Sequence, residues 1–168
     1  MSLSMYQASV PVFVRALANL RHVLQKGEAH AKARGVSDAV LLQTRLIPDM
    51  LPLVKQVQIA CDMACRGAAC LAGEEPKSFE DNEATVAEVY DRIDRAIAYV
   101  QSFKAERIDG SESRAIQLKM RNGELNLQGQ DYLLQFILPN LYFHCATAYN
   151  LFRGMGVEIG KTDFVGAL

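Results

Sequence analysis

The 168-residue chain contains no tryptophan, only three histidines and no excess of charge of either sign. Eighteen Lys and Arg residues stand against nineteen Asp and Glu residues, which gives a net charge of −1. Because binding to phosphate backbones and to anionic membranes depends on basic residues, this balance argues against nucleic-acid and membrane partners. No apolar run is long enough to cross a bilayer, and the N-terminal stretch lacks the features of a secretory signal.

The four cysteines form no CxxC pair, and no second pair of Cys or His accompanies them; they are Cys61, Cys65, Cys70 and Cys145. A structural zinc site commonly needs two close pairs of such ligands. Cys61 and Cys65 share one helix face, so they are either small core residues in a reducing compartment or a redox or metal pair. The first interpretation is the simpler one, and we therefore expect a cytoplasmic protein.

Length and periodicity predict one helical domain that spans residues 1–168. Half of the residues are hydrophobic, which is enough for a sizeable core. Apolar residues recur at steps of three and four, as on one face of a helix, in residues 4–34, 48–73, a segment that begins at Thr85, and 131–153. Thr85 and Glu88 form a capping box at the start of the third segment.

Between the third and fourth helical segments the pattern changes to strict alternation, over residues 116–121 and 124–128. Asn122-Gly123 lies between these runs and is a strong hairpin signal, because both residues tolerate a positive φ. We expect a small two-stranded hairpin that packs on the helices. Pro139 predicts a kink in the fourth segment, because its ring crowds the carbonyl of Gln135.

These elements predict an all-α fold, a four-helix bundle with a small β-hairpin between helices three and four. The link after the third helix is the longest, and long links can join parallel helices. An up-up-down-down order therefore fits better than simple up-and-down. The apolar tail, residues 157–168, is expected to fold back on the bundle.

Polar residues on the inward helix faces are the candidate site. Asn140, His144 and Thr147 are spaced four and three apart on the fourth helix, and Gln58 and Asp62 are four apart on the second. If these helices are neighbours, the five side chains can meet in one small polar pocket that binds a ligand. The alternative is a satisfied hydrogen-bond network around His144 in the core.

The remaining polar residues have simpler interpretations. His22 and His30 are expected to be exposed. The residues Glu80, Asp81 and Glu83 allow a cation site or an acid–base pair, but a solvated charge cluster is simpler. The third helix is expected to carry its charges on a wet face, at Asp91, Arg92, Asp94 and Arg95. No GxSxG, HExxH, P-loop or GxGxxG motif is present.

Several segments resemble a bacterial and fungal family of unknown function that is similar to a branch of the DinB/YfiT-like superfamily. They are residues 45–50 (RLIPDM), 56–60 (QVQIA), 131–134 (DYLL), 138–140 (LPN), 142–144 (YFH), 147–149 (TAY) and 160–164 (GKTDF). The resemblance implies a four-helix bundle that is often a homodimer. Several members of the superfamily are metal-dependent thiol transferases or isomerases that act with mycothiol, bacillithiol or glutathione.

Those enzymes hold a divalent metal with one His on helix two and an HxxxH pair on helix four. The resemblance places His144 at the second His of that pair and Asn140 at the first, while Gln58 or Gln56 falls at the helix-two position. An amide oxygen binds zinc or nickel far more weakly than an imidazole does. No metal is therefore expected, with His144 the only matching ligand position.

Three functions remain open. The first is a non-catalytic or small-ligand-binding protein, dimeric, with a degenerate metal site. The second is a metal- or thiol-dependent transferase or isomerase rebuilt around His144, with His144 as base or ligand and Asp62 orienting it. The third is a structural or partner-binding module that uses an exposed apolar patch. The sequence identifies no substrate or cofactor.

Overall fold

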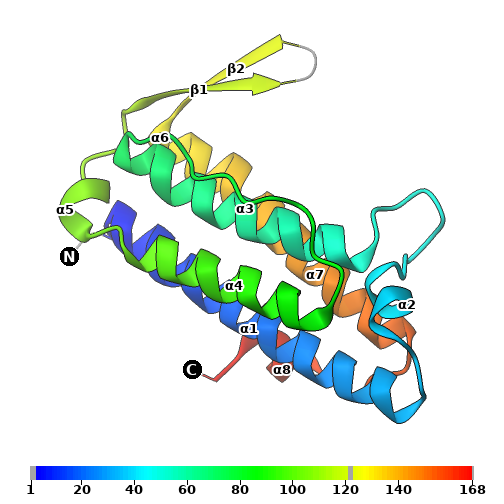
Figure 1. Ribbon diagram of the computed structural model, residues 1–168. Coiled ribbons are helices and arrows are strands. Elements are labelled where there is room, and N and C mark those ends of the chain that lie inside the picture. The colour runs from blue at the N-terminus through cyan, green and yellow to red at the C-terminus, as the bar shows by residue number, and fades with distance from the viewer. Residues whose placement is uncertain (1–2, 121–122, 168) are drawn as a thin grey trace.

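The structure is a computed structural model that describes residues 3–120 and 123–167 (Figure 1). Its long helices lie side by side and are α1 (Met5–Ala33), α3 (Leu53–Ala72), α4 (Val86–Gln101) and α7 (Leu138–Gly154). Shorter elements connect and extend them: α2 (Asp38–Leu42), α5 (Ala105–Ile108), α6 (Gly129–Asp131), the π-helical turn η1 (Tyr132–Ile137) and α8 (Lys161–Val165). The four predicted helical segments are therefore confirmed.

The directions of the long helices differ from the prediction. In Figure 1, α1 and α7 run from left to right, whereas α3 and α4 run from right to left. Contacts between α3 and α4 advance together along both helices, from Asp62 with Arg92 to Cys65 with the Ala96 carbonyl, so these two helices are parallel. The order is up-down-down-up, and the predicted up-up-down-down order is wrong. Residues 73–85 run along the length of the bundle, from the end of α3 to the start of α4. The longer link, residues 102–128, instead turns back at one end of the bundle.

The helix ends show which sequence signals set them. The predicted capping box is confirmed at α4, because Thr85 Oγ1 accepts from the Glu88 backbone N–H at 3.3 Å and Glu88 Oε2 accepts from the Thr85 N–H at 2.8 Å. α3 begins at Leu53 rather than near Pro48, because the Leu53 N–H donates to the Thr44 carbonyl in the preceding loop at 2.9 Å. It ends at Gly73, whose φ of 75° suits a left-handed cap.

The distortion that Pro139 predicts takes the form of a π-helical turn. In η1 the backbone N–H of Leu138 bonds to the carbonyl of Leu133, five residues earlier. The wider turn lies directly before Pro139, whose ring cannot donate to the preceding helical carbonyl. The extra residue in this turn rotates the start of α7 relative to a regular α-helix. It therefore affects the direction in which the side chains of α7 point.

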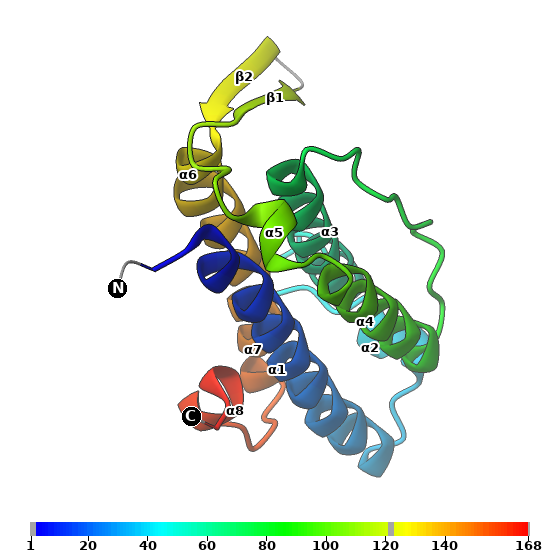
Figure 2. The same cartoon turned by 90° about the vertical axis from the view of Figure 1, so that its left-hand side faces the viewer.

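The predicted hairpin is present as β1 (Ala115–Met120) and β2 (Gly123–Gln128), and it projects from one end of the bundle (Figure 2). The strands pair antiparallel, with Ala115 opposite Gln128 and Met120 opposite Gly123. Gly123 is thus a strand residue rather than a turn residue, and Asn122 lies outside the described residues.

Small residues let the helices of the bundle approach closely. A Cβ added to Gly27 of α1 would lie 2.0 Å from the Phe152 ring of α7, so this contact requires glycine. Cys61, Cys65 and Cys145 are buried free thiols, as expected for small core residues. Within the described residues, no helix is both long and apolar enough to span a membrane.

Candidate functional site

His144 of α7 is held by a glutamine of α3. Its Nδ1 lies 2.8 Å from Oε1 of Gln56, and Gln56 Nε2 donates to the Leu51 carbonyl at 3.0 Å. Because the second bond fixes the amide, Oε1 acts as the acceptor and His144 Nδ1 carries the proton. Burial lowers the pKa of the half-buried His144, so the neutral ring presents Nε2 as an acceptor.

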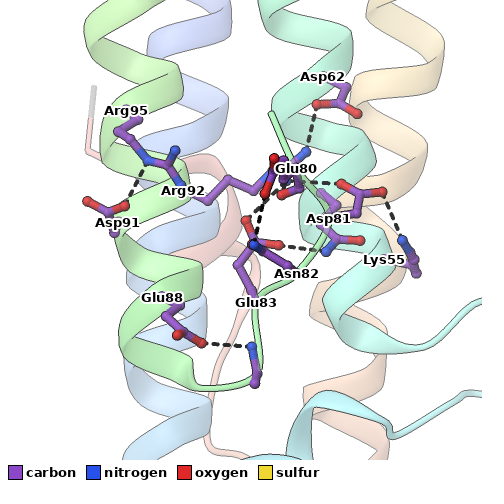
Figure 3. A network of polar contacts seen from close by, with 12 residues as sticks. Lys55, Asp62, Glu80, Asp81, Asn82, Glu83, Glu88, Asp91, Arg92 and Arg95 are labelled. Atoms are coloured by element: carbon purple, nitrogen blue, oxygen red, sulfur yellow. Dashed lines mark hydrogen bonds and ion pairs between the residues drawn. The ribbon is translucent and has the colours of Figure 1, made fainter. Parts of the chain in front are cut away.

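Gln58 and Asp62 belong to a different group of side chains, here named the Arg92 cluster: Gln58, Asp62, Asp81, Glu83 and Arg92. Figure 3 shows the last four of these residues. Arg92 Nη2 donates to Asp62 Oδ1 at 2.8 Å, and Nη1 lies 3.0 Å from both Glu83 Oε1 and Asp81 Oδ1. Gln58 Nε2 donates to Glu83 Oε2 at 2.7 Å. The cluster joins α3 and α4 through the link that precedes α4.

Two expectations about these charges are wrong. The Arg92 side chain is fully buried rather than on a wet face, and the Glu83 side chain is 2% exposed rather than solvated. A buried guanidinium needs opposite charges nearby, and the residues before α4 fold back to supply them. The available signal was spacing, because Arg92 lies three residues after Val89 and four before Ala96, on the edge of the apolar stripe.

Two opposing effects act on the pKa values in the cluster: burial of the charged groups and their pairing with opposite charges. Desolvation raises the pKa of Asp62, and the charge of Arg92 opposes this only in part. Burial also acts on Asp81, but the hydrogen bond from Lys55 and the charge of Arg92 hold the pKa of Asp81 below its usual value. Burial disfavours the Arg92 cation, yet Glu83 and Asp62 raise the pKa of Arg92 and keep it charged. The cluster is an ion-pair network that binds the parallel helices together.

Asn140 and Thr147 bond to their own helix. Asn140 Nδ2 donates to the Phe136 carbonyl at 2.6 Å, and Thr147 Oγ1 donates to the Phe143 carbonyl at 2.7 Å. Among the described residues, no hydrogen bond joins His144 to either of them, nor to Gln58 or Asp62. The single polar pocket expected from spacing is therefore divided into a His144–Gln56 pair and the separate Arg92 cluster.

The residues present do not fit the metal centre that the superfamily implies. The described part of the chain contains no group of three or more His, Cys, Asp or Glu side chains placed to hold a metal ion. At the α3 position facing His144 the partner is the Gln56 amide. That amide is already engaged by the Leu51 carbonyl, so it completes a structural bond rather than a ligand set.

The structure also contains an apolar cavity that the sequence did not reveal. It has a volume of about 280 Å³ and lies between α1, α7 and α8. Its lining is apolar at Ala16, Leu20, Val23, Cys145, Phe164 and Val165, with polar groups from Arg15, Asn19 and Tyr142. Burial raises the pKa of the Cys145 thiol to about 12, so this group is not a reactive thiolate at neutral pH.

The C-terminal segment, residues 160–167, forms one wall of this cavity, and α8 lies beside α1 and α7 in Figure 2. Asn19 Nδ2 donates to the Phe164 carbonyl at 3.0 Å and to the Val165 carbonyl at 2.8 Å. Arg15 Nη2 donates to the same Val165 carbonyl at 3.1 Å and to that of Ala167 at 2.9 Å. The tail thus folds back as predicted, held by polar bonds to α1.

Asp163 of α8 makes a second attachment. His22 Nε2 and Lys26 Nζ lie 2.8 and 2.7 Å from its Oδ1, and the Gly160 N–H donates to Oδ2 at 2.8 Å. The bond from Lys26, with those from Gly160 and His22, holds the pKa of Asp163 far below its usual value. His22 is thus exposed, as expected, but it is also ion-paired when protonated.

The arrangement of the helices and their hairpin defines a DinB-like helical bundle. A crystal structure of a DinB family member protein from Shewanella denitrificans matches it with a TM-score of 0.88 and 37% sequence identity, covering 97% of this chain and 92% of that chain. Within that class, residues 5–165 match the family described as "Domain of unknown function (DUF1993)", and the chain belongs to this family. A comparison with curated proteins gives no match. The resemblance seen in the sequence is confirmed, and no specific catalytic function comes with it.

Proposed function

We propose that this protein binds a small, largely apolar molecule in the cavity between α1, α7 and α8 and does not carry out metal-dependent catalysis. The observation that carries the proposal is the cavity of about 280 Å³ with its apolar lining. An apolar cavity of about 150 Å³ in an engineered lysozyme binds benzene. On that scale the present cavity has room for about ten non-hydrogen atoms.

Packing supports this assignment. Protein interiors are close-packed, and side chains that border a void lose dispersion contacts on that side. A bound apolar molecule restores those contacts and removes its own surface from water. A largely apolar pocket with a few polar groups is also the usual form of a small-molecule site.

The test is to fill the cavity from its α1 wall. Ala16 is 7% exposed and lines the cavity, so Ala16→Met places a flexible side chain in the space. Ala18→Met is the matched control, because Ala18 is exposed on the same helix. Thermal unfolding is measured with and without octan-1-ol.

The expected result is a rise in Tm on adding octan-1-ol to the wild type and to Ala18→Met, with little or none in Ala16→Met. At a hundred times Kd the stabilisation is about 2.7 kcal/mol, which for a chain of this size is a rise on the order of 5–10 °C. Equal shifts in all three proteins, or none in the wild type, would contradict the proposal.

A second candidate is a thiol-dependent transferase in which His144 acts as a general base without a metal. The observation that favours it is the neutral, half-buried imidazole, whose Nε2 is available to accept a proton from a thiol. Gln56 rather than Asp62 then orients the ring. Consumption of glutathione by a model electrophile, accelerated by the wild type and not by His144→Ala, would establish this candidate.

We also propose a homodimer in a reducing, cytoplasmic setting. Exposed apolar side chains on η1 and α7, at Leu134 and Phe143, support self-association. The four free thiols support a reducing compartment. Light scattering on the wild type and on Phe143→Ser tests the dimer, and a monomeric mass for the wild type would overturn it.

A further inference from the structure

Arg15 brings a positive charge to the wall of the apolar cavity. Its guanidinium donates through Nε and Nη2 to the backbone carbonyls of Val165 and Ala167, which are neutral acceptors. Among the described residues, no carboxylate forms an ion pair with it, whereas Arg21 on the same helix is paired with Asp94 at 2.8 Å. Its Nη1 makes no hydrogen bond to a described residue, and Arg15 is exposed at the rim of the cavity, so the guanidinium is open to an anionic ligand.

A second donor lies in the same lining. The hydroxyl of Tyr142 makes no hydrogen bond within the described part of the chain. Burial raises the pKa of Tyr142, so the hydroxyl stays protonated at neutral pH and can donate. The cavity therefore combines apolar side chains of α1, α7 and α8 with a guanidinium and a phenol, both of which can donate to an anionic oxygen.

We propose that the ligand of this cavity is an anionic amphiphile, a single apolar chain of about eight carbons that ends in a carboxylate. The chain lies among Ala16, Leu20, Val23 and Phe164, and the carboxylate accepts from Arg15 with Tyr142 beside it. This assignment rests on the proposed binding function and adds the chemical class of the ligand. About ten non-hydrogen atoms fill the cavity, and octanoate has that size.

Two features of the wall fit such a ligand. No residue of α8 is fully buried. Phe164 is the member of α8 that packs against the core, with its ring 5.8 Å from that of Tyr149, and polar bonds to α1 hold the segment beside it. Segments with few buried contacts open at low cost in free energy, so α8 can admit a chain from outside. Arg15 bonds to the backbone of this segment and, in the proposal, also to the carboxylate of the ligand. The bound carboxylate therefore lies at the edge of the cavity that the C-terminal segment covers.

The experiment is calorimetric titration of the full chain with sodium octanoate and with octan-1-ol, which has the same chain and no charge. The variants are Arg15→Gln, Arg15→Lys and the control Arg21→Gln. We expect Arg15→Gln to weaken octanoate binding about tenfold, which corresponds to ~1.4 kcal/mol, and to change octan-1-ol binding less than twofold. Arg15→Lys should retain most of the octanoate affinity, and Arg21→Gln should retain all of it.

A chain-length series tests the depth of the cavity in the same way. From butanoate to octanoate, each added methylene is expected to raise the affinity about fourfold, corresponding to ~0.8 kcal/mol. The increase should stop beyond about ten non-hydrogen atoms, when the cavity is full. An affinity that continues to rise through tetradecanoate would show that the chain is not confined to this cavity and would overturn the assignment.

The outcomes separate this inference from the proposed function. If Arg15→Gln weakens octanoate and octan-1-ol equally, Arg15 acts only by holding the C-terminal segment, and the head-group assignment fails while the binding function stands. Binding of octan-1-ol without octanoate likewise overturns the anionic class alone. If the wild type binds neither compound, both the inference and the proposed function fail.

Discussion

Replacing Arg92 with methionine is expected to destabilise the protein more than any exposed substitution on the same helix. The change keeps an unbranched apolar stem and removes a guanidinium whose side chain is fully buried. Its removal leaves Glu83, 2% exposed, with Gln58 as a partner but without the cation at 3.0 Å. Breaking a buried ion pair from one side costs about 3–5 kcal/mol, because the remaining charge stays desolvated and unpaired.

The matched control is Arg95→Met, three residues further along α4. Arg95 is 49% exposed. Within the described residues it forms an ion pair with Asp91, four residues earlier on the same helix, and its guanidinium lies 5.2 Å from the centroid of the Phe79 ring. Such a surface pair contributes about 0.3–0.5 kcal/mol and an exposed cation–π contact about 0.5–1 kcal/mol, so Arg92→Met should cost at least about twice as much as Arg95→Met. Urea unfolding measures both free energies, with the slope of the transition checked for constancy.

A double variant identifies the source of the loss. In Arg92→Met with Glu83→Gln, the buried carboxylate becomes a neutral amide, and about 1–3 kcal/mol of the loss should be recovered as coupling. If Arg92→Met costs less than about 1 kcal/mol, or if Glu83→Gln gives no recovery, the claim that buried charge pairing joins α3 to α4 is refuted.

Three further predictions address the other contacts. His144→Ala removes the partner of the buried Gln56 oxygen and should cost about 1–2 kcal/mol in urea unfolding, while elemental analysis of tag-free protein should show the same metal content in both forms. Asp163→Asn should lower stability at pH 7. Since the folded-state pKa of Asp163 is depressed, its contribution is present above its usual pKa and is lost as the pH falls through the lower folded value; a difference in Tm that persists unchanged at pH 2 would contradict the ion pairing. Gly27→Ala should cost about 1–3 kcal/mol by overpacking against the Phe152 ring, whereas Gly154→Ala, with open space around it, should be neutral or stabilising; equal effects would refute the close helix contact.

Local sequence signals predicted the elements of this fold but not their directions. The capping box at Thr85 and the glycine cap at Gly73 act within a few residues, and the structure places both helix ends there. Helix direction depends instead on where a link crosses the bundle, and the length of residues 102–128 was a misleading guide because this link contains α5 and the hairpin. Length limits how far a link can reach, but it does not require the link to extend that far.

The candidate site was only partly predictable for a related reason. Spacing correctly places His144 toward α3, but it does not decide whether Gln56 or Gln58 meets it. The two lie on nearly opposite sides of α3, and this helix is buried around most of its circumference. Nor can spacing show that Asn140 and Thr147 bond to their own helix carbonyls. The cavity is a property of packing between α1, α7 and a tail more than a hundred residues distant from α1 in sequence, and no local pattern encodes it.

The two faces of α7 show how the proposed binding site can lie away from the position at which the sequence resemblance implies a metal. His144 points to α3, where its Nδ1 bonds to the Gln56 amide, which in turn donates to the Leu51 carbonyl. Cys145 and Tyr142, its near neighbours in sequence, line the cavity on the side of α1 and α8. The Gln56 amide makes the contact between α3 and α7 a hydrogen-bonded one, because an amide can both accept from His144 and donate to the backbone. In the proposed function the ligand occupies the apolar cavity between α1 and α7, and the short α8, which forms one wall of that cavity, is the element expected to open and close over it.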